Sequence, residues 1–188
     1  MKTTVSGTLQ LDDHPRLIVG AMAFRLRQKE HCPAFDDDTE LVRREADLYL
    51  AGTTFDYDKA THNAHLVRAR IMQRRVLTLL AEWSRTGVET YRRAAVAHVR
   101  RMGRWPYWSW IVWRERDRRP DAIYDLSYGE NAATLAFAWD WLYPTLTARE
   151  KEMMLAIARR WPFAAFRARD EARQNWWFGK PDSNWNTV

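Results

Sequence analysis

The chain has 188 residues, of which 46% are hydrophobic and 29% charged, a balance that excludes a disordered segment. Its apolar runs are all shorter than the roughly 18 residues that a membrane-spanning helix needs. Thirty Lys and Arg against 24 Asp and Glu give a formal net charge of +6, which favours an anionic partner: nucleic acid, anionic lipid or acidic polysaccharide.

The first 15 residues, MKTTVSGTLQLDDHP, lack the apolar core of a secretory signal. We therefore predict a cytoplasmic protein, or a periplasmic or secreted one if the true N-terminus lies upstream of Met1. The lone Cys32 cannot form a disulfide within the chain and has no companion metal ligand, so we expect an inert thiol.

Apolar residues recur at helical spacing through most of the remaining chain. The predicted helices cover residues 39–52, 62–85, 88–102, 127–143 and 147 to at least 161. Gly87 ends the second of them, and Thr147 with Glu150 forms a capping box at the start of the last. Pro162 is expected to kink that last helix or to start a new segment.

No stretch alternates apolar and polar residues strongly enough to predict a strand. The fold class is therefore all-α, with six or seven helices in one domain over residues 1–188, and neighbouring helices are expected to pack as antiparallel hairpins. Arginine pairs occur at positions 43–44, 74–75, 92–93, 100–101 and 159–160. We interpret them as outer helix faces and not as one basic patch.

Eleven tryptophans are the most unusual feature of the composition. A buried indole N–H needs a partner, whereas an exposed aromatic face stacks well on sugars and bases, so the composition favours carbohydrate or nucleic acid. Three aromatic loops at residues 104–121, 124–131 and 175–186 are the candidate binding segments. The alternatives are that the first loop covers helix ends and that Glu130 is a first-turn acid that complements the helix dipole.

The last loop is the best candidate site, because Asn184 and Asn186 flank Trp185 and so combine hydrogen bonding with stacking. A turn would need the Asn residues but not the tryptophan. The sequence lacks a Gly-rich phosphate loop and a nucleophile elbow. His62 and His65 lie three apart without a third ligand, so we predict a solvated pair, no metal and no cofactor.

Four segments resemble, in order, the N-terminal region of heparinase II/III-like polysaccharide lyases. They are HPRLIV (14–19), RRMGRWPYW (100–108), DLSYGENAATLAFAWDWLYPTLTAREKEMM (125–154) and SNWNTV (183–188). The most specific pieces are AWDWLYPTLT with the capping box, and the terminal Asn-Trp-Asn. The resemblance implies part of an incomplete (α/α) toroid of antiparallel helix hairpins, with a β-sandwich part expected downstream. It also implies β-elimination on uronate-containing polysaccharides such as glycosaminoglycans and alginate.

This chemistry removes a weakly acidic C5 proton, and hydrogen-bond donors on the adjacent carboxylate stabilise the enolate-like transition state. The resemblance implies that Asn184 neutralises that carboxylate, while a Tyr or His base and a Tyr acid lie beyond Val188. Trp185 stands where family members often have His, which indicates a stacking role. The other expected substrate contacts are Asn186, Trp176, Trp177, Tyr128 and Glu130. The implied partner is an acidic polysaccharide or oligosaccharide, and neither nucleic acid nor a membrane.

Two other functions fit the residues. A toroid glycoside hydrolase would use Glu130 and Asp182 as paired acids about 5–10 Å apart. A non-catalytic helical module would bind carbohydrate or nucleic acid, the latter through a contiguous arginine stripe with a steep salt dependence. In the lyase interpretation, the 188 residues alone are expected to be inactive and poorly soluble, because an incomplete toroid exposes apolar helix faces.

Overall fold

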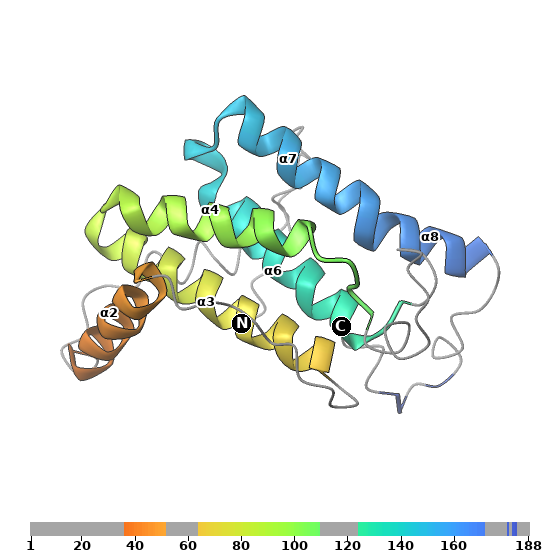
Figure 1. The fold of residues 1–188 in the computed structure, drawn as a ribbon, viewed down its shortest axis with the longest axis horizontal. Helices are drawn as coiled ribbons and strands as arrows, with labels where there is room; N and C mark the ends of the chain where they lie inside the picture. Colours follow the sequence, from red (N-terminus) through yellow and green to blue (C-terminus); the bar gives the residue numbers. More distant parts are fainter. Residues whose placement is uncertain (1–35, 52–63, 110–123, 172–179, 181, 184–188) are drawn as a thin grey trace, which may run out of the picture.

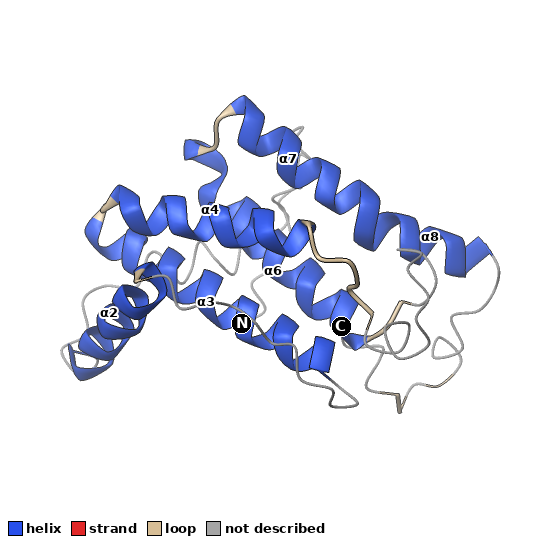
Figure 2. Cartoon of the chain, in the orientation of Figure 1, coloured by secondary structure: helices blue, strands red, loops and turns tan. Residues whose placement is uncertain are grey.

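The computed structural model describes residues 36–51, 64–109, 124–171, 180, 182 and 183. Within these residues every regular element is helical, which confirms the predicted all-α class (Figure 2). The α-helices are α2 (Asp36–Leu50), α3 (Ala64–Thr86), α4 (Glu89–Gly103), α6 (Leu126–Leu142), α7 (Ala148–Ala158) and α8 (Ala164–Glu171). A 3₁₀ turn, η2 (Tyr143–Thr145), precedes α7, and a π-helical turn, η3 (Arg159–Phe163), follows it.

Short local signals set three of the described helix ends, and two of these signals, Gly87 and the capping box, are the ones that the sequence predicts. Gly87 follows α3 with φ of 70°, a left-handed conformation that glycine adopts without strain. The Asp125 side chain caps α6 by accepting from the Ser127 backbone N–H at 2.9 Å. The capping box of α7 is confirmed, with both bonds between Thr147 and Glu150 present.

Most predicted helix ends lie within two residues of the observed ones, whereas the start of the first helix and the end of the last differ by at least three. A new segment does begin after Pro162, as expected. The first described helix begins three residues before Thr39, at Asp36. The segment around Pro162 widens into the π-helical turn, because proline has no N–H to donate to the preceding turn. The new segment α8 then continues in nearly the same direction as α7 (Figure 1).

Two antiparallel hairpins form the centre of the described structure (Figure 1). The first is α3–α4, and the second is α6–α7. Helix α3 packs against both α4 and α6, and α4 packs against α7, so the two hairpins lie side by side. Helices α3 and α6 run in one direction, and α4 and α7 run in the other.

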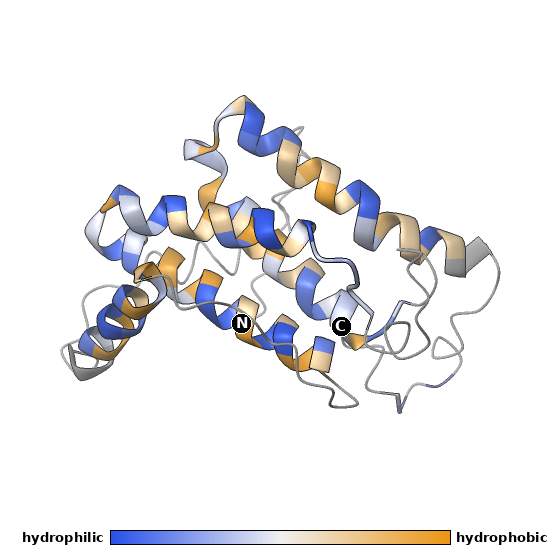
Figure 3. Cartoon of the chain, viewed as in Figure 1, coloured by the Kyte–Doolittle hydropathy of each residue, from blue (hydrophilic) through white to orange (hydrophobic). Residues whose placement is uncertain are grey.

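The core lies between these four helices. Its largest fully buried apolar side chains are Trp108, Trp161, Tyr128, Met72, Leu79, Leu80, Met102, Leu142 and Met154. Hydrophobic and hydrophilic residues alternate along α3, α4 and α7, as expected of helices with one buried face (Figure 3). None of the helices in the described ranges is long and apolar enough to span a bilayer.

The interpretation of the arginine pairs as outer helix faces is wrong for Arg92. Only 7% of its side chain is exposed. It donates to the Glu150 carboxylate at 2.7 Å and to the Thr145 carbonyl at 2.8 Å. Arg92 therefore ties α4 to the turn between α6 and α7, a tertiary contact that residue spacing within α4 does not reveal.

Gly103 on α4 packs tightly against Ile157 on α7. A Cβ atom at this position would lie 2.4 Å from both Cδ1 and Cγ1 of Ile157. Glycine to alanine normally stabilises a helix by up to about 1 kcal/mol. Here we expect Gly103→Ala to lower the free energy of unfolding by about 1–3 kcal/mol, because the added methyl overpacks the contact. Urea denaturation would measure this.

The control is a double-mutant cycle with Ile157→Ala, which removes the atoms that the new methyl would meet. In the Ile157→Ala background, Gly103→Ala should be neutral or stabilising. Additive losses in the double variant would show that the steric explanation is wrong.

Candidate functional site

Most of the predicted site lies outside the described residues. Asn184, Trp185, Asn186, Trp176 and Trp177 belong to this group, and their roles stay predictions. Asp182 is described as an exposed turn residue, next to a backbone bond from Ser183 N to Lys180 O of 2.9 Å.

Tyr128 lies in an aromatic cluster at the junction of the N-terminal end of α6 with the C-terminal end of α4. The cluster comprises Trp108, Tyr124, Tyr128, Trp161 and Phe166. The rings of Trp108 and Trp161 are parallel within 5°, with centroids 5.3 Å apart. Tyr128 is 1% exposed and stacks on Tyr124 at 5.2 Å. It is thus a core residue among the described side chains, and its contact with a sugar stays a prediction.

The two stacked tryptophans have a structural reason. The indole N–H of Trp108 donates to the Met102 carbonyl at 3.0 Å, and that of Trp161 donates to the Gly103 carbonyl at 3.1 Å. These carbonyls belong to the last turn of α4, where helix oxygens lack intrahelical partners. The alternative that the first aromatic loop covers a helix end is therefore correct for Trp108.

Glu130 forms an ion pair between helices. Its Oε1 lies 2.8 Å from Nε of Arg70 on α3, and its side chain is 19% exposed. The Gln73 side chain donates to the Glu130 carbonyl at 3.3 Å. Because α6 begins at Leu126, Glu130 lies beyond the first turn, and the dipole explanation is wrong. A role in the cleft stays a prediction.

His65 corrects another expectation, since it is buried at 6% exposure and is not half of a solvated pair. Burial, assisted by the positive charge of Arg68, lowers the pKa of His65 to about 4, so the imidazole is neutral near pH 7. Arg68 lies 2.8 Å from Nδ1 of His65, donates to the Tyr107 carbonyl, and stacks 3.7 Å from the Trp105 ring centroid. His62 lies outside the described residues.

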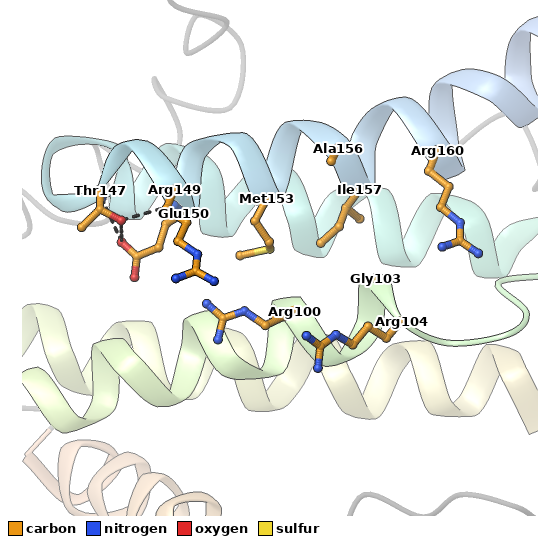
Figure 4. A pocket seen from close by; sticks show the side chains of 10 residues that line it. All are labelled: Arg100, Gly103, Arg104, Thr147, Arg149, Glu150, Met153, Ala156, Ile157 and Arg160. Atoms are coloured by element: carbon orange, nitrogen blue, oxygen red, sulfur yellow. Dashed lines mark hydrogen bonds between the residues drawn. The ribbon is translucent and has the colours of Figure 1, made fainter.

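The described residues contain a pocket of 640 Å³ between α4 and α7 (Figure 4). We call it the α4/α7 groove; it is lined by Arg100, Gly103, Arg104, Thr147, Arg149, Glu150, Met153, Ala156, Ile157 and Arg160. Figure 4 shows the four arginines extending from both helices toward the space between them. All four are exposed.

The charges of the groove are unbalanced. Glu150 is its one acidic lining residue, and the Arg92 guanidinium already binds that carboxylate. The ion pairs between described residues are formed by other arginines. None of them involves Arg100, Arg104, Arg149 or Arg160. Arg100 and Arg160, which belong to two of the arginine pairs that we expected on separate outer faces, thus line one groove together with Arg104 and Arg149.

The sequence contained a weak signal for this groove. Arg100 and Arg104 are one turn apart, and Arg149, Met153, Ile157 and Arg160 follow a helical stripe. Adjacent arginine pairs do not show this pattern. The arginines that converge on the groove come from different helices. No group of three or more His, Cys, Asp or Glu among the described side chains could hold a metal ion.

Comparison with protein-family models found no family that matches the chain, and comparison with curated proteins found no match either.

Proposed function

We propose that this chain is the helical N-terminal part of a polysaccharide lyase that cleaves uronate-containing chains by β-elimination. The observation that carries the proposal is the ordered resemblance to heparinase II/III-like lyases, above all over residues 125–154. This segment starts at the Asp125 cap of α6 and extends through the capping box into α7. The resembling residues thus span one helical hairpin.

The packing of the hairpins supports a toroid as the architecture. In the described part, α3 and α6 run parallel to each other, as do α4 and α7. An (α/α) toroid repeats this relation, with successive hairpins adding one helix to an inner layer and one to an outer layer. Helix α6 suits an inner position, since it packs against α3, α4 and α7.

The proposed reaction assigns one step to this chain. Asn184 donates to the substrate carboxylate and so stabilises the charge that develops when the C5 proton leaves. Trp185, Trp176 and Trp177 stack on sugar rings beside it. The base and the acid come from residues beyond Val188, so the complete reading frame is the active species in this proposal.

The test is ultraviolet detection of unsaturated uronate, with protein expressed from the complete reading frame and supplied with alginate, heparan or chondroitin. We expect product from the parent and a rate lower by about 10²–10³ for Asn184→Ala, the usual effect of losing one such donor. The matched control is Asn175→Ala, which removes an amide from the same segment and should retain most of the activity.

Product that is unaffected by Asn184→Ala would retain the lyase and remove Asn184 from the mechanism. New reducing ends without unsaturated product would favour the hydrolase. If neither kind of product forms on any uronate, both enzyme functions are rejected for these substrates.

A further inference from the structure

We propose that the α4/α7 groove is a second binding site, specific for an anionic polysaccharide chain, and that its arginines hold successive carboxylate or sulfate groups. The preference for an anion follows from the groove itself. The choice of a polysaccharide rests on the proposed function.

The charge of the groove favours an anionic ligand. Arg100 and Arg104 lie at the C-terminal end of α4, where the helix dipole favours cations. The helix dipole does not favour Arg149, because this residue is in the first turn of α7, at the positive end of that helix. Like charges one turn apart also repel each other. A bound anion would reduce both the unfavourable interaction of Arg149 with the helix dipole and the repulsion between Arg100 and Arg104.

The positive charges are spread along the groove. Arg149 and Arg160 are eleven residues apart along α7 and η3, which corresponds to about 16 Å at the α-helical rise. Arg100 and Arg104 lie on the opposite wall (Figure 4). The cations therefore line an elongated groove and do not surround one point. This arrangement suits a chain with repeated anionic groups better than a single small ion.

The surface between the arginines is apolar. It consists of Gly103, Met153, Ala156 and Ile157, which offer an apolar wall to the C–H faces of sugar rings. None of the described lining residues is aromatic. Single-stranded nucleic acids are usually held by aromatic side chains that stack on their bases, and this lining offers no such ring. The choice of a sugar chain therefore rests on the proposed function, and the lining itself calls for an anionic chain bound through its charged groups.

Guanidinium groups also suit the proposed ligand, because their planar donors match a carboxylate or sulfate with two parallel hydrogen bonds. The four side chains are exposed, so they can reach a ligand without rearrangement of the core.

The experiment measures binding and not catalysis. Size-defined alginate and heparin oligosaccharides would be titrated at low salt into the protein from the complete reading frame. The site variant is Arg104→Ala with Arg149→Ala, one from each wall. The matched control is Arg44→Ala with Arg167→Ala, which removes two exposed arginines from α2 and α8. Both double variants have the same net charge, and thermal melting would confirm that both are folded.

We expect the site variant to bind roughly tenfold or more weakly, as for the loss of charge-assisted hydrogen bonds, and the control to bind nearly as the parent. Equal losses in both variants, or no loss in either, would overturn the groove as a site. The polysaccharide assignment would be overturned if the parent binds single-stranded DNA of equal charge more tightly than the oligosaccharides and the site variant weakens that DNA binding. If the site variant weakens binding but the parent forms no unsaturated product, the lyase proposal alone is rejected. If the parent forms unsaturated product but the site variant binds as the parent does, the groove proposal alone is rejected.

Discussion

Glu150→Ala lowers the free energy of unfolding at pH 7 by about 2–4 kcal/mol, because it removes a charge-assisted hydrogen bond of a buried arginine together with part of a helix cap. The variant leaves Arg92 buried without its nearest carboxylate, which lies 2.7 Å away in the parent. It also removes the Glu150 half of the α7 capping box. Urea denaturation of the parent and the variant would measure the difference.

Glu89→Ala is the matched control, because Glu89 also contacts Arg92, at 3.0 Å, but its side chain is 54% exposed. An exposed ion pair contributes at most about 1 kcal/mol, so this variant should be close to the parent. Similar losses for the two variants would contradict the importance of burial at this contact.

The loss should also depend on pH. Burial acts to raise the pKa of Glu150, but hydrogen bonds from Arg92 and Thr147 outweigh it and lower the pKa below 4.5. A lowered folded-state pKa contributes stability above pH 4.5 that disappears as the pH falls through the folded-state value. The difference between the parent and Glu150→Ala should therefore shrink below pH 4.5. A constant difference down to acidic pH would exclude the ionised carboxylate as its cause.

Helix positions were predictable from the sequence because their signals are local. Gly87, Asp125 and the Thr147–Glu150 pair each act within one turn, and each marks a helix end in the structure. The burial of Arg92 was not predictable in this way. Its partners Thr145 and Glu150 are more than fifty residues away, and the pattern of α4 alone assigns an arginine to the surface.

The candidate site was less predictable than the fold for a similar reason. Tyr128 and Glu130 were identified by residue type, but their neighbours Trp161 and Arg70 come from other helices. The four arginines of the α4/α7 groove also come from different helices, and only the packing of α4 on α7 brings them together. Local patterns do not contain such pairings, whereas they do contain helix caps.

Trp108→Ala should lower the free energy of unfolding by about 3–5 kcal/mol, because it removes a fully buried ring from the core. The loss includes the stacking on Trp161 and leaves the Met102 carbonyl without the indole N–H. Trp83→Ala is the control, since Trp83 is half-buried, and we expect a loss of about 1–2 kcal/mol from its smaller buried area.

This comparison also tests what the tryptophan content means. A large loss of stability at Trp108 would show that this indole serves the core, and the sugar-stacking interpretation would then rest on Trp176, Trp177 and Trp185. If Trp108→Ala leaves stability unchanged but weakens binding of an acidic oligosaccharide, the indole contacts the ligand and the core assignment is wrong.

Trp108→Phe separates the contribution of ring packing from that of the indole hydrogen bond. It retains an aromatic ring but loses the bond to the Met102 carbonyl, which contributes about 1 kcal/mol.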